Sequence, residues 1–99
     1  MHSADRNSQE IRIVQLAKSF ACLRKAPGVA PWDANIVDDR AATDIPSHGE
    51  KCSAQFILAV RNPDHEWQSG KFDLMEALRI WDDPSRQAFL AWVAKLWWA

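Results

Sequence analysis

The side chains whose types and spacing point most directly to chemistry are His48 and Cys52, which stand four residues apart. On a helix this spacing brings both side chains to one face, one turn apart. Imidazole and thiolate bind zinc, and a histidine base can also activate a cysteine nucleophile. No third ligand stands at a matching spacing, and Cys52 falls among apolar residues, where a free cysteine packs as a small hydrophobic side chain. Core packing is therefore the favoured interpretation, and we expect neither a metal nor a cofactor.

Two acidic groups are weaker candidates for catalysis. Asp64, His65 and Glu66 have the residue types for acid–base work, but they lie in an expected surface turn. Asp82 and Asp83 form a carboxylate pair, but Asp83 precedes a proline and is expected to cap a helix. The sequence has no phosphate-binding glycine loop, nucleophile elbow or zinc-protease motif. We therefore assign no catalytic residue, and a small enzyme of unknown reaction remains an alternative that would use His48, Cys52 or His65.

A helix–turn–helix is the second constellation considered, because a short expected helix, 74–81, precedes a longer one, 84–97. Ser85, Arg86 and Gln87 stand where such a motif presents side chains to base edges. The rest of that helix is largely apolar, however, and the two preceding aspartates would lie near phosphates. DNA reading through this pair is therefore not favoured.

Charge and hydropathy narrow the function classes further. The formal net charge of −1 supplies no general attraction to phosphates. Residues 1–25 carry a local excess of positive charge and residues 33–50 an excess of negative charge, so a nucleic-acid-associated regulator that uses the basic first helix or the 74–97 pair is the runner-up. No apolar run is long enough to span a bilayer, and two lone cysteines indicate reduced thiols. We expect a cytoplasmic protein without a membrane segment.

The aromatic residues at the end of the chain are the strongest feature that chemistry does not explain. The chain has six Trp and no Tyr, and it ends Lys95-Leu96-Trp97-Trp98-Ala99. Adjacent helical side chains project about 100° apart, so one core cannot easily bury both terminal Trp rings. Trp67 is a further ring without an obvious place, and Trp is enriched at interface hot spots. Either Trp97 seals the core and Trp98 folds over a loop, or these rings form a contact surface. We predict a non-catalytic interaction protein that binds a partner, or a second copy of itself as a homodimer, through Trp67, Lys95, Trp97 and Trp98.

The elements that must position these groups are helices. Ninety-nine residues, 47% of them hydrophobic and 25% charged, fit one globular domain. Capping signals stand at Asn7, Ser47 and Asp73. We expect an all-α fold, an irregular bundle of four to five helices, with residues 1–7 frayed and 27–47 rich in loop. The expected helices cover residues 8–26, a short turn over 31–37, and then 48–61, 74–81 and 84–97.

The expected core is aromatic and draws on three of the expected helices. Its largest members are Phe20, Phe56, Phe89 and Trp92. In the loop-rich stretch the expected anchors are Trp32, Ile36 and Val37. The last helix is apolar around most of its circumference, Leu90, Val93 and Leu96 included, so we expect it to be central. Residues 56–60 fit a short buried strand as well as a helix, but a lone strand has no partner, and the helix is favoured.

Overall fold

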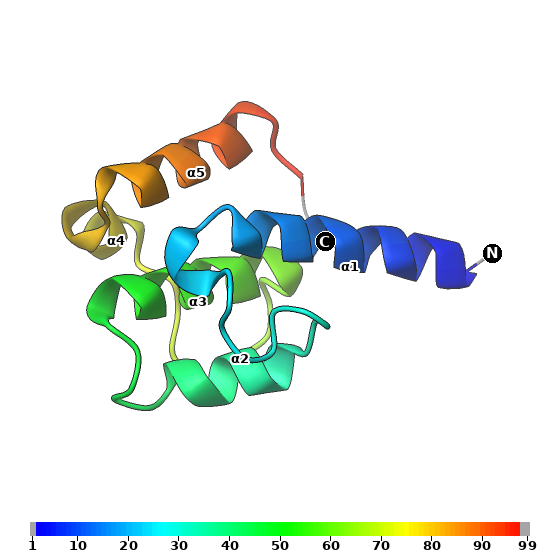
Figure 1. Ribbon diagram of the computed structural model, residues 1–99, viewed down its shortest axis with the longest axis horizontal. Helices are drawn as coiled ribbons and strands as arrows, with labels where there is room; N and C mark the ends of the chain where they lie inside the picture. Colours follow the sequence, from blue (N-terminus) through cyan, green and yellow to red (C-terminus); the bar gives the residue numbers. More distant parts are fainter. Residues whose placement is uncertain (1, 98–99) are drawn as a thin grey trace.

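A computed structural model describes the backbone of residues 2–97 and the side chains of residues 8–97. Helices supply all the regular secondary structure of this part of the chain, which confirms the all-α prediction (Figure 1). The elements are α1 (His2–Lys18), the 3-10 turn η1 (Ala21–Leu23), α2 (Ala34–Ala41), α3 (His48–Arg61), α4 (Leu74–Ile80) and α5 (Asp83–Ala94). Within the described residues, no helix combines the length and the apolar character that crossing a bilayer requires.

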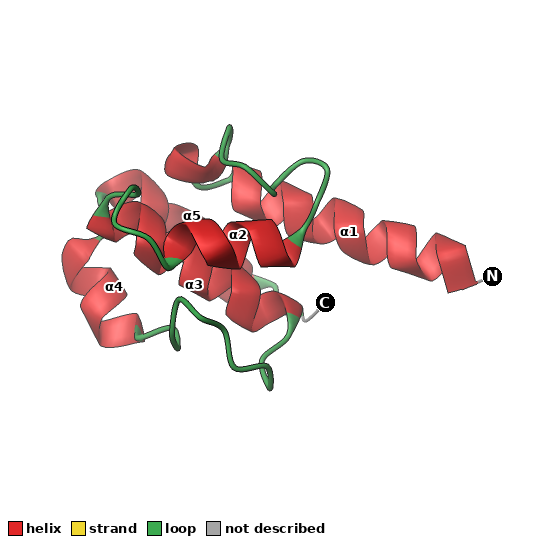
Figure 2. Ribbon diagram, turned by 90° about the horizontal axis from the view of Figure 1, so that it is seen from below, coloured by secondary structure: helices red, strands yellow, loops and turns green. Residues whose placement is uncertain are grey.

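Helix α3 is the central element, because α1, η1, α2 and α4 all pack against it (Figures 1 and 2). It begins where the capping box predicted, since the Ser47 hydroxyl accepts a 3.2 Å hydrogen bond from the Glu50 backbone N–H. Residues 56–60 lie inside this helix and do not form a strand. Its buried residues are Cys52, Ser53, Ala54, Phe56, Ile57, Leu58 and Val60.

Helix α5 lies at the edge of the bundle, so the expectation that it is central is wrong. Trp92 is 8% exposed and Phe89 is half-buried against the core, but Leu90 and Val93 face solvent. The helix ends at Ala94, and the following Leu96 is exposed as well. Periodicity shows that one stripe of α5 is apolar, but it does not show which part of that stripe has a neighbour.

The start of α5 is one residue earlier than predicted. Asp82, not Asp83, is the N-cap, and its carboxylate accepts a 3.0 Å hydrogen bond from the Ser85 backbone N–H. Asp83 is the first helical residue and pairs with Arg86. Asp73 caps α4 as predicted, accepting from the Glu76 N–H at 3.1 Å.

Helix α1 begins at His2 and ends at Lys18, whereas the pattern predicted residues 8–26. Asn7 therefore lies inside the helix and does not cap it, and residues 2–7, expected to be frayed, are helical. The apolar face was predicted correctly, because Ile13, Leu16, Ala17, Phe20 and Leu23 are all buried. The chain leaves the helix where the Ser19 hydroxyl bonds back to the Leu16 carbonyl and Phe20 becomes extended. A short 3-10 turn then returns Leu23 to the core, so the apolar spacing continues although the α-helix does not.

The loop-rich stretch contains α2, which begins three residues later than the expected turn over 31–37. Asp33 caps it by accepting from the backbone N–H groups of Asn35 and Ile36. Val37 and the half-buried Trp32 anchor the stretch to the core as expected, whereas Ile36 is exposed.

Asp38 is buried, although it is a charged residue next to Asp39 and Arg40. Its two carboxylate oxygens accept hydrogen bonds from the backbone N–H groups of Gln68 and Ser69 and from the Ser69 hydroxyl, at 2.8–3.0 Å. This carboxylate therefore fastens the loop after α3 to α2.

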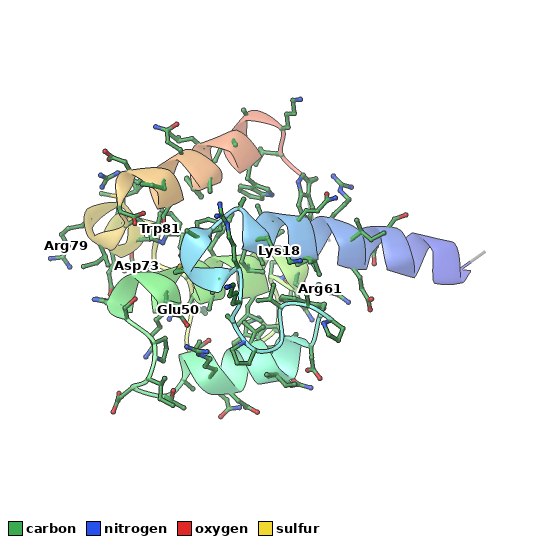
Figure 3. The ribbon with its side chains drawn as sticks, viewed as in Figure 1. Lys18, Glu50, Arg61, Asp73, Arg79 and Trp81 are labelled. Atoms are coloured by element: carbon green, nitrogen blue, oxygen red, sulfur yellow. The ribbon has the colours of Figure 1, made fainter. Side chains whose placement is uncertain are left out.

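The core is built around Phe56 on α3. Rings from four other segments surround it at centroid distances of 5.1–6.2 Å. They belong to Phe20, Phe72, Trp81, Phe89 and Trp92. In Figure 3, Arg79 on α4 points away from the body, whereas Trp81 lies against α3. Of the predicted core residues, Phe20, Phe56 and Trp92 are buried and Phe89 is partly buried.

Candidate functional site

A groove of about 410 Å³ runs between α1 and α5. Its wall on the α1 side is polar except for Leu16, and its wall on the α5 side is apolar except for Lys95. It is lined by Arg12, Gln15, Leu16 and Ser19 from α1 and by Ala88, Ala91, Trp92, Lys95 and Trp97. Two of these residues are cations, and none of the lining residues that the structure describes is acidic. The groove therefore combines an apolar floor with a positive rim.

The segment after α5 closes one end of this groove. Lys95 terminates the helix, and its N–H bonds the Trp92 carbonyl at 3.1 Å. The chain then turns back toward α1, as the red segment in Figure 1 shows. There the Trp92 indole N–H donates to the Trp97 carbonyl at 3.1 Å, and the Arg12 guanidinium lies 4.4 Å from the centre of the Trp97 ring. Trp97 is thereby held half-buried over α1.

The outer face of α5 adds exposed apolar surface beside the groove. Leu90, Val93 and Leu96 are 52%, 41% and 61% exposed. Leu90 and Val93, three residues apart, lie along one side of α5, and Leu96 follows beyond the end of the helix. Monomeric proteins seldom expose contiguous apolar surface without using it for contacts.

The predicted partner-binding residues do not all meet. Lys95 and Trp97 line the same groove, but Trp67 lines a different cavity. Trp98 lies outside the described residues, so its predicted role stays a prediction. Sequence reasoning missed Arg12, which belongs to the polar face of α1. No spacing links it to Trp97, because the two meet only through the fold.

Trp67 packs against the core at the far end of α3, in a cavity of about 430 Å³. The ring centroids of His65 and Trp67 are 4.1 Å apart, and Asp64 and Glu66 line the same cavity. The indole nitrogen of Trp67 is buried, and it has no hydrogen-bond partner among the described residues. All three titratable groups are exposed, as the surface-turn interpretation expected.

The α4–α5 pair uses its polar residues for structure. Arg86 donates to the backbone carbonyls of Leu78 and Trp81 and pairs with Asp83, so its guanidinium holds the end of α4 against α5. Ser85 is buried. Two of the three side chains that a DNA-reading helix would present are therefore engaged within the fold, and reading through this pair stays an untested alternative.

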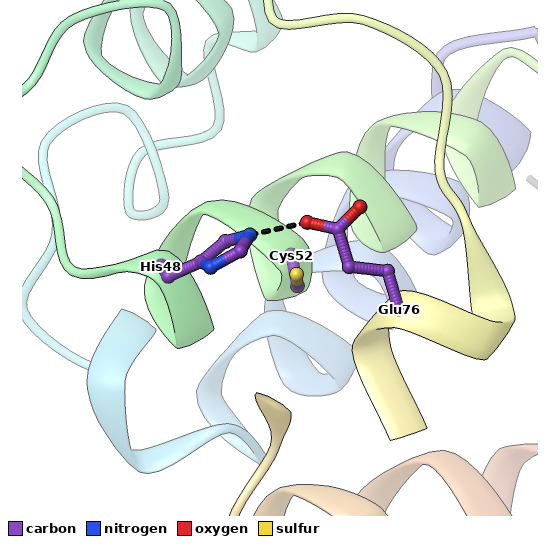
Figure 4. Close-up of side chains that lie close together, drawn as sticks. All are labelled: His48, Cys52 and Glu76. Carbon is purple, nitrogen blue, oxygen red and sulfur yellow. Dashed lines mark hydrogen bonds and ion pairs between the residues drawn. The ribbon is translucent and has the colours of Figure 1, made fainter. Parts of the chain in front are cut away.

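A third site joins the starts of α3 and α4 (Figure 4). His48 is the first residue of α3, and Cys52 lies one turn later on the same face. Glu76 comes from the first turn of α4, where its carboxylate pairs with Nε2 of His48. One ligand atom of each residue, a ring nitrogen, the Sγ and a carboxylate oxygen, lies within 4.8 Å of the other two. Sequence reasoning missed Glu76, because 28 residues separate it from His48.

The three groups differ in their exposure. Cys52 is buried at 3% exposure, whereas the side chains of His48 and Glu76 are 52% and 38% exposed. Burial raises the pKa of the Cys52 thiol, and the negative charges of Glu76 and Asp73 raise it further, while Lys51 lowers it. His48 and Glu76 also line an open cavity of about 470 Å³ that contains Lys51 and Lys71. The thiol thus forms the floor of the cluster, and the other two groups form its solvent side.

Comparison with known proteins gives no family for the chain. No family model, curated protein or solved structure matches it. Function has to be argued from the sites themselves.

Proposed function

We propose that this chain is a non-catalytic interaction protein whose α1–α5 groove binds an amphipathic helix of a partner protein that carries carboxylates beside its apolar face. The observation that carries the proposal is the composition of the groove, an apolar floor rimmed by Arg12 and Lys95. Helices with one apolar face dock into apolar grooves through residues at i, i+3 and i+4 spacing.

The floor suits such an occupant because its side chains leave room. Ala88 and Ala91 are small, and they stand one turn apart on the side of α5 that faces the groove. Leu16, Trp92 and Trp97 supply larger apolar surface around them. Aromatic side chains at the centre of an interface contribute disproportionately to its binding energy.

The rim selects the charge of the occupant. Arg12 and Lys95 lie on opposite walls, one on α1 and the other at the end of α5. Carboxylates on either side of a docked apolar face would be attracted to these cations, and lysines in the same places would be repelled. Rim charges chiefly affect partner choice and association rate, so charge is the property to vary in a test.

The experiment uses the full chain labelled with ¹⁵N and two synthetic amphipathic helices. One carries leucines on one face and glutamates on the other, and the second has lysines in place of the glutamates. We expect the glutamate peptide to shift the indole N–H resonances of Trp92 and Trp97, and the lysine peptide to leave them unchanged. The double variant Arg12→Glu/Lys95→Glu should reverse this preference. Lys18→Glu is the matched control, because Lys18 is exposed on α1 but does not line the groove.

Two outcomes would contradict the proposal. One is that both peptides bind alike, or neither binds, in the wild-type chain and in the charge-reversed variant. The other concerns the oligomeric state, measured as molar mass by light scattering across a concentration series. A dimer that the Arg12→Glu/Lys95→Glu variant dissociates would identify a second copy of the chain as the occupant, in place of a different protein.

A further inference from the structure

The structure assigns a zinc-binding site to His48, Cys52 and Glu76, at the junction of α3 and α4 and independent of the α1–α5 groove. The site uses three protein ligands and leaves one position open to solvent.

The donor set fits zinc better than it fits Mg²⁺, Ca²⁺ or Cu(I). It offers one imidazole nitrogen, one sulfur and one carboxylate oxygen, whose ligand atoms lie within 4.8 Å of one another. Zn²⁺ accepts all three donor types, whereas Mg²⁺ and Ca²⁺ require oxygen donors and Cu(I) favours sulfur. A thiolate and a carboxylate together also balance the double positive charge of the ion.

The geometry needs only small side-chain movements. With metal–ligand distances of about 2.0–2.3 Å, the ligand atoms of a tetrahedral zinc site lie roughly 3.5 Å apart. The widest separation in the cluster, at most 4.8 Å, must therefore shrink by no more than roughly 1.3 Å, and the close contact between His48 and Glu76 must widen to the same spacing. Cys52 is fixed in the core, but His48 and Glu76 are at least one-third exposed and can adjust their rotamers. In the bound state the ion takes the place of the direct contact between His48 and Glu76.

The surroundings explain how an ion would reach the site. Cys52 closes it from the core side, and the cavity of about 470 Å³ opens on the side of His48 and Glu76. Lys51, Lys71 and Asp44 line that cavity, so its charged groups are of both signs. The fourth position of the ion would face this space and accept water or a small anion. On binding, the Cys52 thiol loses its proton to solvent and the sulfur binds as thiolate.

The alternative is a purely structural cluster, in which His48 and Glu76 join α3 to α4 and Cys52 fills space. The two interpretations differ in what Zn²⁺ does to the protein. A structural cluster gives no saturable binding, whereas a site binds one ion per chain and raises the unfolding temperature as the ion concentration rises.

The test titrates Zn²⁺ alone into the full, tag-free chain after treatment with a chelator, in competition with a chromophoric zinc indicator. We expect one ion per chain, with a Kd below about 10 μM, weaker than four-ligand structural sites. Replacement of a direct ligand in Cys52→Ala, His48→Gln or Glu76→Gln should weaken binding by at least about 100-fold. Co²⁺ should give a thiolate charge-transfer band that Cys52→Ala removes.

Matched controls use the other cysteine and another histidine. Cys22→Ala and His65→Ala change exposed residues outside the cluster and should leave the zinc affinity unchanged. Because Cys52 is buried, its variant is checked for folding by circular dichroism, and the two partly exposed ligand variants decide the matter if it unfolds. The assignment is overturned if no ion binds below about 10 μM, if the ligand variants bind as well as wild type, or if Cys22→Ala or His65→Ala abolishes binding.

Discussion

The indole N–H of Trp81 donates a 2.9 Å hydrogen bond to the hydroxyl of Ser53, across 28 residues of sequence. Both residues are buried: Ser53 has no exposed surface, and Trp81 is 3% exposed. The same hydroxyl donates to the Gly49 carbonyl one turn earlier in α3, so it satisfies polar groups on two helices at once. This one hydroxyl ties the end of α4 to the central helix.

Removal of the Ser53 hydroxyl should lower the stability of the fold more than the loss of one oxygen atom usually does. In Ser53→Ala the Trp81 N–H stays buried without its acceptor, and we expect a loss of about 1–3 kcal/mol in the free energy of unfolding. Urea unfolding followed by tryptophan fluorescence measures this loss. Ser8→Ala, at an exposed position on α1, is the control and should change little. Equal stability of Ser53→Ala and wild type would show that the indole finds another acceptor.

Trp92 and Leu90 offer a test of which side of α5 faces the core. Trp92 packs edge-on against Phe56 at 5.1 Å, whereas Leu90 is 52% exposed. We expect Trp92→Ala to cost about 3–5 kcal/mol and Leu90→Ala less than about 0.5 kcal/mol. Thermal unfolding of both variants checks the pair. Similar losses at the two positions would mean that α5 is rotated from the orientation described.

Gly28 should tolerate alanine worse than Gly70 does. Both have a positive φ, which costs an L residue about 1–2 kcal/mol. At Gly28 a Cβ would also lie 2.9 Å from the Asp33 carbonyl oxygen, the Ile36 Cβ and the Val37 nitrogen, whereas at Gly70 the nearest atom is 3.6 Å away. Gly28→Ala should therefore lower the melting temperature further than Gly70→Ala. A larger drop in melting temperature for Gly70→Ala would contradict the close approach of the backbone at Gly28 to the start of α2.

The cap of α5 makes stability depend on pH. Hydrogen bonds from the Ser85 N–H and hydroxyl lower the pKa of Asp82. The folded state therefore binds this proton less readily than the unfolded chain, and the carboxylate stabilises the fold fully above its unfolded pKa of about 3.9. That contribution is lost as the pH falls through the lower folded pKa. Asn caps helices about as well as Asp but does not titrate.

We therefore expect urea midpoints of wild type to fall more steeply than those of Asp82→Asn as the pH is lowered below about 4. Parallel curves for the two proteins would show that the cap does not couple to protonation.

Local signals in the sequence predicted where helices form better than they predicted which helices pack against each other. The Ser47 and Asp73 caps are where the pattern placed them, because a cap depends on residues three positions apart. Asn7 has the same spacing to Glu10 but lies inside α1, so the local signal alone does not decide where a helix begins. The end of α1 was missed, since the apolar spacing continues through η1 to Leu23 although the backbone hydrogen-bond pattern changes.

What the sequence could not predict depends on contacts between distant segments. Asp38 reads as a surface residue until the loop at Gln68 and Ser69 supplies donors for its carboxylate. The His48–Cys52 pair was found from its spacing, but Glu76 reaches it only because α4 packs against α3. The aromatic end was recognised as unusual, yet the position of Trp97 over Arg12 depends on the turn after α5.

The central position of α3 also determines which parts of the molecule open most readily to solvent. Its backbone amides are covered by helices that come both before and after it in the sequence, so they can exchange hydrogen with solvent only when much of the fold opens. The first turns of α1 project beyond the body, and α5 lies at its edge (Figure 1). The first turns of α1 can open without disturbing Phe56, whereas opening of α5 would separate Phe89 and Trp92 from that ring. Because the groove lies between α1 and α5, a docked helix would hold α5 in place and slow amide exchange in that helix first.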